Sequence, residues 1–447
     1  PESFFFAPDG NKMFVMGAAN DIVYQYSLST AWDLSTASYT QGFGVSTQED
    51  GPKGVFFKSD GTKMYVIGSS TDRVYQYSTT LATAQLDLST GSVFDYTPTS
   101  NAQVKLTNPA ASGTASGATL LLGSEDSAGV ASTFSTTLYT GTGAAKTISN
   151  GLNLSTDGGL VWIKRRDSAG SHSLWDSGRG ISNWLSSDST SAQIDYTTTA
   201  MVSFNTDGFT LGVDTVVNAS AASMVSWTFK KKTKFFDIVT YTGTGVAQNI
   251  SHSLGGDVGF LLIKRTDSTG NWRCWHRGLP GTGSNMEFNQ TGAYETATTV
   301  FNGTDPTSTQ FSVGTNSNVN ASGGTYVAYL FAHDTDASSL IKCGSLNISS
   351  QATVEVDLGW ESQFVMLKPS SAVGNWFMFD TMRGMAVNSF EWLYANSSAA
   401  AEVKAYQSVY PTATGFGFNP VNNGQLVDGT YIYMAIRNSS IPTITYD

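Results

Sequence analysis

Internal repetition constrains the fold of this chain more than any other feature. Near the N-terminus, FFFAPDGNKMFVMGAANDIVYQYS (4–27) recurs 51 residues later as VFFKSDGTKMYVIGSSTDRVYQYS (55–78). Each copy indicates strand, Asp-Gly turn, strand, polar turn and strand, because Asp-Gly favours tight hairpin turns and VYQYS alternates apolar with polar residues. MFVMG and MYVIG predict short strands buried on both faces. A unit of this size is typical of one propeller blade.

A second repeat family fills the rest of the chain. VWIKRRDSAG (161–170) recurs as LLIKRTDSTG (261–270) and, more diverged, as VMLKPSSAVG (365–374). Each copy continues with an aromatic strand and closes on an apolar strand: MVSWTFK, YVAYLFA or IYMAIRN. Strand-length segments separated by frequent turns predict a β-sandwich, jelly-roll-like, in each copy.

The repeats divide the chain into five predicted parts. We expect two β-propeller-like repeats over 1–96, a linker over 97–133 with one short strand at 118–122, and β-sandwich repeats over 134–235, 236–338 and 339–447. The alanine-rich stretch 396–408 is the one place that indicates a short helix. Ser, Thr and Gly together with 10 Trp, 19 Tyr and 25 Phe are typical of an all-β fold with many turns. The predicted architecture is therefore an all-β, multi-domain rod.

Charge and cysteine content narrow the function classes. Only 13% of residues are charged and the net charge is −11. Nucleic-acid binding through phosphates needs a basic face; the one dense basic run, FKKKTKFF (229–236), is interpreted as a solvated strand end. Two cysteines, Cys274 and Cys343, do not make a disulfide framework, and no apolar run is long enough for a membrane helix. The chain begins PESFFF without an initiator Met, so we expect residues upstream of Pro1.

The segment GLVWIKRRDSAGSHSLWDSGRG (159–180) contains the residue types of nucleophilic hydrolysis, Asp, His and Ser. The three copies align there without gaps, and Trp272 and Trp376 replace His172 in the sister repeats. Lysine, the turn glycine and an aromatic persist instead: Lys164, Lys264, Lys368; Gly170, Gly270, Gly374; Trp175, Trp275, Phe379. His172 and Ser173 are also neighbours, so their side chains would point to opposite sheet faces. We predict a structural hairpin and no enzyme.

Binding is the more plausible chemistry, because Trp and Tyr stack on sugar rings. The candidate surface or glycan contacts are Arg179, Trp184, Trp392 and Tyr394. Two alternatives stay open: a salt-bridged turn around Arg179 and in the related Arg-Gly loops of the other copies (GRG, HRG, MRG), and aromatics packed inside the sandwich. HDTDAS (333–338) offers oxygens for Ca²⁺, although a polar linker is the simpler interpretation. Scattered histidines predict no metal site, and nothing indicates a cofactor.

Both repeat types resemble segments of predicted tail-fibre and other virion structural proteins of marine tailed phages, including phages of cyanobacteria. The resemblance rests on GLVWIKRRDS with H-x-L-W-D-S-x-R-G and the closing MVSWTFK, and on F-x-P-D-G-x-K-M-[FY]-V-x-G at the N-terminus. It implies a non-enzymatic virion component, such as a tail fibre or appendage that attaches to the host surface. A capsid decoration protein, a polysaccharide-degrading tailspike and a secreted carbohydrate-binding adhesin remain alternatives.

Partners and location follow from this resemblance and from the repeats. Two blades do not close a propeller of roughly 4–8 blades, so we expect either that further blades precede Pro1 or that blades from several chains close a ring together. We expect a homo-oligomer, with a trimer favoured because three chains would supply six blades. Other virion or tail proteins and host surface polysaccharide are the further expected partners, without nucleic acid or membrane insertion. The expected location is the virion, after assembly in the host cytoplasm.

Overall fold

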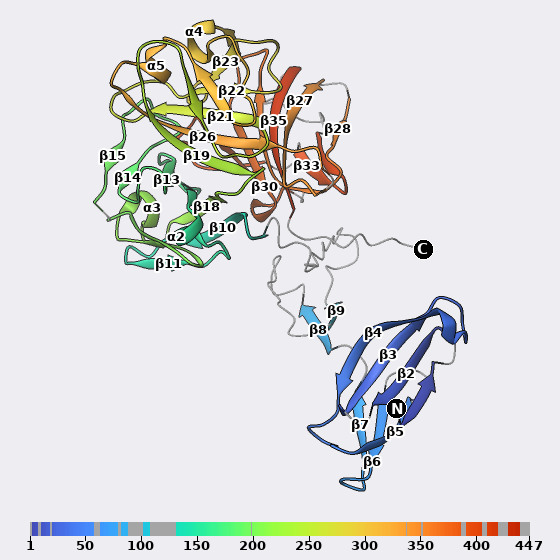
Figure 1. Ribbon diagram of the computed structural model, residues 1–447. Coiled ribbons are helices and arrows are strands. Elements are labelled where there is room, and N and C mark those ends of the chain that lie inside the picture. The colour runs from blue at the N-terminus through green and yellow to red at the C-terminus, as the bar shows by residue number, and fades with distance from the viewer. Residues whose placement is uncertain are drawn as a thin grey trace. The chain divides into compact units, whose positions relative to one another are not determined.

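The chain forms two compact units, Pro1–Leu120 and Leu121–Asp447. A computed structural model describes residues 2–7, 10–17, 20–57, 63–78, 82–87, 102–107, 131–197, 199–336, 338–349, 352–385, 390–404, 409–418 and 428–438. Nearly all of its regular structure is β, in antiparallel sheets apart from one parallel pair (Figure 1). The all-β prediction is therefore confirmed.

The first unit contains two antiparallel meanders in the order of the sequence. The first has four strands: β1 (Ser3–Phe6), β2 (Lys12–Gly17), β3 (Ile22–Leu28) and β4 (Ala37–Gly44). The second has three: β5 (Pro52–Phe57), β6 (Lys63–Gly68) and β7 (Val74–Ser78). Gly10, at the first turn, has φ of 72°, as the Asp-Gly signal predicts; the second Asp-Gly turn lies outside the described residues. The sequential order is that of a propeller blade.

The two meanders pack on each other through one face each. Phe14 and Phe57 pack with ring centroids 4.1 Å apart and ring planes tilted by 33°, and Met16 and Val66 are fully buried in the shared cluster. The opposite faces are open, since Ile67 keeps 49% of its surface exposed. The prediction that MFVMG and MYVIG are buried on both faces is thus wrong within a single chain, because two blades cover only one face of each other.

The predicted linker overlaps a parallel strand pair, β8 (Ala82–Asp87) with β9 (Ala102–Thr107). The short strand expected at 118–122 lies outside the described residues. The helix expected over 396–408 is wrong in its described part: a turn and an irregular stretch lead into strand β32 (Glu402–Lys404). That strand pairs with β31 (Phe390–Tyr394), where Trp392 lies opposite Glu402. Sheet pairing overrides the helix propensity of alanine here.

The second unit is built from three repeats of the same strand order. The first comprises β10 (Phe134–Thr140), β11 (Lys146–Ile148), α2 (Leu154–Asp157), β12 (Gly159–Arg165), β13 (Ser173–Asp176), β14 (Asn183–Trp184), β15 (Ile194–Asp195), β16 (Met201–Asn205), β17 (Gly208–Leu211), α3 (Thr215–Asn218) and β18 (Ser223–Lys230). The second comprises β19 (Phe236–Thr242), β20 (Gln248–Ser251), β21 (Asp257–Arg265), β22 (Arg273–His276), β23 (Ser284–Glu287), β24 (Glu295–Thr296), α4 (Thr298–Phe301), β25 (Gln310–Val313), α5 (Ser317–Asn320) and β26 (Thr325–His333). The third comprises β27 (Ile341–Ile348), β28 (Val354–Asp357), β29 (Ser362–Pro369), β30 (Phe377–Asp380), the short 3-10 turn Thr381–Arg383, β31, β32, β33 (Val409–Thr412), β34 (Gly415–Phe418) and β35 (Gly429–Arg437).

Each repeat has a large and a small sheet. The large sheets share one order: β10-β18-β12-β13, β19-β26-β21-β22 and β27-β35-β29-β30, the last two extended by further strands. The small sheets are β11-β17-β16, β20-β25 and β28-β34-β33. In all three, the closing strand pairs with the first strand and with the lysine-bearing strand, so the hairpin 159–176 and its copies occupy the same place in each repeat.

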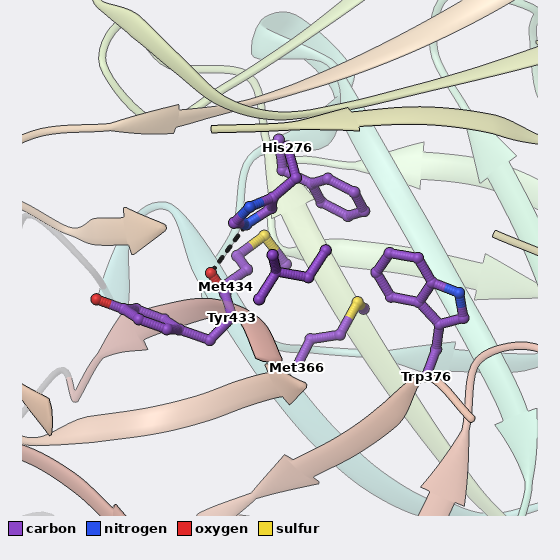
Figure 2. A pocket seen from close by; sticks show the side chains of 7 residues that line it. His276, Met366, Trp376, Tyr433 and Met434 are labelled. Carbon is purple, nitrogen blue, oxygen red and sulfur yellow. Dashed lines mark hydrogen bonds between the residues drawn. The ribbon is translucent and has the colours of Figure 1, made fainter. Parts of the chain in front are cut away.

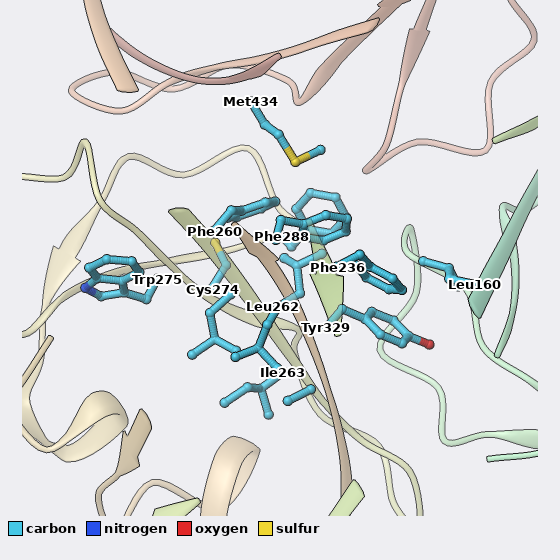
Figure 3. Close-up of a cluster of buried hydrophobic side chains, with 14 of the residues drawn as sticks. Leu160, Phe236, Phe260, Leu262, Ile263, Cys274, Trp275, Phe288, Tyr329 and Met434 are labelled. Carbon is cyan, nitrogen blue, oxygen red and sulfur yellow. The ribbon is translucent and has the colours of Figure 1, made fainter. Parts of the chain in front are cut away.

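The three repeats share one core and do not form the predicted rod. One cluster of buried side chains contains residues of all three repeats, among them Leu160, Phe260 and Met434 (Figure 3). The sheets of the first and third repeats also enclose smaller clusters of their own. The apolar strands that the sequence assigned to separate sandwiches thus face a common centre, and the second unit is one compact body.

Candidate functional site

The hairpin 159–180 and its two copies lie where the repeats meet. In each, the lysine-bearing strand pairs with the aromatic strand in the same register: Leu160 opposite Asp176, Phe260 opposite His276 and Phe364 opposite Asp380. The chain after each hairpin forms an acceptor loop, a name used here for residues 186–190, 287–292 and 394–398. Each hairpin donates hydrogen bonds to the acceptor loop of a neighbouring repeat, in cyclic order: first to third, second to first, third to second.

The persistent lysine and turn glycine donate to the same carbonyl of the acceptor loop. Lys164 Nζ lies 3.3 Å and Gly170 N 2.8 Å from the carbonyl oxygen of Ser398. The second repeat repeats this with Lys264, Gly270 and Thr190 at 3.1 and 2.9 Å, and the third with Lys368, Gly374 and Thr291 at 3.2 and 2.9 Å. All three lysines are fully buried, and burial lowers the pKa of each to about 8. These residues persist because they join repeats.

A second set of hydrogen bonds between repeats forms at the position of His172, where the other two repeats have tryptophan. His172 Nε2 lies 3.0 Å from the Tyr394 carbonyl, while its Nδ1 accepts from Trp162 Nε1 at 2.8 Å. Trp272 Nε1 donates to the Ser186 carbonyl at 2.8 Å and Trp376 Nε1 to the Glu287 carbonyl at 3.4 Å. With Nδ1 accepting, Nε2 carries the proton and donates. Histidine and tryptophan interchange because each offers one ring N–H at this point.

A third set of hydrogen bonds between repeats forms at the last residue of the aromatic strand. At this position the residue type differs between the repeats. Asp176 accepts from Tyr329 Oη at 2.7 Å, and Asp380 accepts from Trp227 Nε1 at 2.9 Å. Tyr329 and Trp227 hold equivalent positions on closing strands β26 and β18; on β35 that position is a methionine, which has no N–H or O–H. The second repeat accordingly has His276 in place of aspartate.

His276 supplies a ring N–H to a backbone carbonyl of the third repeat. Its Nε2 lies 3.0 Å from the Tyr433 carbonyl, and its Nδ1 accepts from Gly278 N at 3.0 Å (Figure 2). A hollow beside it is lined by apolar and aromatic side chains, with Met366 and Trp376 opposite, and is too narrow for a water molecule. Burial lowers the pKa of His276 to about 3. The ring is a neutral structural donor.

Arg179 lies in a buried salt bridge, which was the alternative to a surface contact. Its Nε is 2.6 Å from Asp176 Oδ2 and its side chain is 4% exposed. Arg383 repeats the arrangement with Asp380 at 2.6 Å, and its guanidinium lies 5.2 Å from the ring of Trp227. The grouping of HRG with these loops was wrong: Arg277 occupies the place of Ser177 and is exposed. The second repeat has His276 where the other two have the aspartate that pairs with an arginine.

The three aromatic candidates are also inside the fold. Trp184 is 7% exposed and packs edge-on against Tyr196 at 5.8 Å. Trp392 is fully buried between Phe377 and Phe379, and Tyr394 is 5% exposed. Their interpretation as surface contacts is therefore corrected: apolar burial of the rings leaves no face on which a sugar could stack.

The remaining candidate groups are paired within the fold. The basic run is neutralised in part by Lys230–Asp157 and Lys231–Asp237, each at 3.0 Å. In HDTDAS, Asp336 pairs with Lys234 at 2.9 Å. Within the described ranges, no cluster of three or more His, Cys, Asp or Glu side chains fits a metal ion. The thiols of Cys274 and Cys343 are free and buried, which raises their pKa.

The buried histidines predict acid sensitivity. Burial lowers the pKa of His172 to about 4 and of His276 to about 3, below their ordinary 6.5. Between about pH 6.5 and 4 the unfolded chain therefore binds more protons than the folded one, so stability falls as the pH falls. At about 1.4 kcal/mol for each pKa unit, the two rings together cost several kcal/mol by pH 4.

The measurement is the free energy of unfolding from denaturant titration at several pH values in that window. His276→Gln keeps an N–H donor that does not titrate, so it should flatten the pH dependence by about one proton. An unchanged slope in the variant would contradict the assignment to His276.

The model of a family described as a domain of unknown function, DUF7483, matches residues 129–439, which cover the three repeats. No curated protein matches the chain. Among the helices of the described ranges, none has the length and apolar character needed to cross a membrane.

Proposed function

The chain belongs to the DUF7483 family, a domain of unknown function, and we propose that it is a non-enzymatic structural protein of a bacteriophage virion. The more specific proposal is a tail fibre or appendage that contacts the host surface. The phage and tail assignments rest on the resemblance of both repeat types to such proteins.

One observation carries the structural role: the side chains that a hydrolase would use join the repeats instead. His172 uses both ring nitrogens, for Trp162 and Tyr394, and neither contacts Ser173. Asp176 accepts from both Arg179 and Tyr329. A general base or nucleophile must reach its substrate, and these side chains are fully buried. Their polar groups hold the repeats together through hydrogen bonds.

The hollow beside His276 gives no support to a polysaccharide-cleaving tailspike. A glycosidase needs two carboxylates roughly 5–10 Å apart on either side of an accessible sugar bond. The hollow is lined by Phe260, His276, Met366, Trp376, Ile432, Tyr433 and Met434, without a carboxylate. A scaffold whose hairpins donate hydrogen bonds across the junctions between repeats suits a component that must stay folded outside a cell.

The test is the position of the chain on particles. Antibodies against the purified protein, carrying gold, should label the tails of virions in electron micrographs of the phage that encodes it. Label on the heads would indicate capsid decoration, and label on uninfected cells a secreted adhesin; either result would overturn the tail assignment. Release of reducing sugar from host envelope polysaccharide by the purified chain would overturn the non-enzymatic assignment.

A further inference from the structure

Each of the two blades of the first unit has two sheet faces, which we call face A and face B. Face A of the second blade consists of Val55, Phe57, Met64 and Val66, and face B of the first blade consists of Phe5, Phe14, Met16 and Val23. The strand register places the members of each set on one side of their sheet. These two faces pack against each other and form the core of the unit.

Each packed face has an equivalent, 51 residues away, that the described residues of the first unit leave more exposed. Face A of the first blade consists of Phe4, Phe6, Met13 and Val15, and face B of the second consists of Phe56, Tyr65, Ile67 and Val74. Phe4 is 67% exposed, whereas its equivalent Val55 is 7% exposed. Val74 is 62% exposed, whereas its equivalent Val23 is 3% exposed. One unit therefore carries an open face B and a face A that is open at Phe4, while Phe6 packs against Trp32 at its edge.

The inner pair of faces is a template for how the open pair fits. Faces related by the repeat have the same apolar character, with Phe6 matching Phe57, Met13 matching Met64 and Val15 matching Val66. Since face A already packs on face B within the chain, the open face A has its complement on any unit with an open face B. A second copy of this chain has that face.

We infer that the first unit is an assembly surface on which copies of this chain join head to tail, face A of one copy on face B of the next. The contact uses two different patches, so it continues until a ring closes. Propellers close with roughly 4–8 blades, and two blades per chain then require about two to four copies. This inference does not depend on the viral role and also fixes which surface each copy contributes.

The test uses the full chain and measures its mass in solution by light scattering and native mass spectrometry. Val74→Asp damages the open face B and Phe4→Asp the open face A. Both positions are exposed in the single chain, so the fold tolerates a charge there. Val246→Asp and Val373→Asp are matched controls, because both valines are similarly exposed, at 65% and 71%, but lie in the second unit.

We expect the wild type and both controls to form a ring of about two to four copies, and each face variant to be a monomer. Mixing Val74→Asp with Phe4→Asp should restore a dimer and nothing larger, because each variant contributes one intact face. A wild type that stays monomeric at micromolar concentration would show that copies of the chain do not join and would overturn the inference. It would also be overturned by face variants that keep the wild-type mass, or by controls that lose it.

Discussion

Replacing Asp176 with alanine should destabilise the second unit by about 3–5 kcal/mol, the usual cost of removing one partner from a buried ion pair. The substitution leaves the guanidinium of Arg179 with its side chain 4% exposed and without its carboxylate. It also removes the acceptor of Tyr329 Oη, which belongs to the second repeat. The loss therefore acts within one repeat and across a junction. Urea or guanidinium denaturation gives the change in free energy of unfolding.

The matched control is Asp167→Ala. Asp167 pairs with Arg165 at 2.7 Å, but both side chains are about one-third exposed, and exposed pairs contribute only about 0.2–1 kcal/mol. A double replacement, Asp176→Leu with Arg179→Met, should recover most of the stability, because apolar side chains can substitute for a buried pair. Equal losses for Asp176→Ala and Asp167→Ala would contradict the role given to the buried pair.

Trp272→Ala should cost a similar amount, about 3–5 kcal/mol, as expected for removing a large aromatic ring from a packed core. Trp272 is fully buried, contacts Tyr329 and Phe288, and donates to the carbonyl of Ser186 in the first repeat. Because the repeats share one cluster, the whole second unit should still unfold in a single transition at a lower midpoint.

Calorimetry and far-UV circular dichroism, followed on the same samples, test both parts of this expectation. Val373→Ala serves as the control, since this valine is 71% exposed and its truncation leaves no cavity. Two separated transitions in Trp272→Ala would mean that the repeats are independent modules, as the rod predicted from the sequence had implied.

The sequence predicted the strands of this fold well, because each repeat contains an apolar strand, a glycine turn and an aromatic strand that together indicate a hairpin. Alignment of the copies separated Lys164 and Gly170, which persist, from His172, which varies. The partners of these groups could not be predicted, because all three donate to main-chain carbonyls. A carbonyl is present in every residue, so the sequence contains no signal for which loop accepts.

The prediction that Trp184 and Trp392 are surface contacts was wrong for a related reason. Trp184 and Trp392 stand among Ser and Asn, which is typical of exposed loops, but their rings are buried. The nearby Asp188 and Asn396 accept hydrogen bonds from the backbone N–H groups of His172 and Trp376 in the hairpins. One signal was available for His276: it replaces aspartate at the end of the second hairpin, and Met434 replaces the Trp or Tyr donor at the equivalent position of the third closing strand. That coupled change points to direct contact between hairpin end and closing strand.

The cyclic order of the acceptor loops also has a consequence for folding during synthesis, because the first repeat binds a loop of the third. Lys164 binds a carbonyl 234 residues further along the chain, and a ribosome adding roughly 5–20 residues each second needs about 10–50 s to produce it. During that time the buried lysine and the apolar seam of the first repeat lack their partners in the third repeat. We expect a chain truncated before its third repeat to aggregate, because this apolar seam stays uncovered.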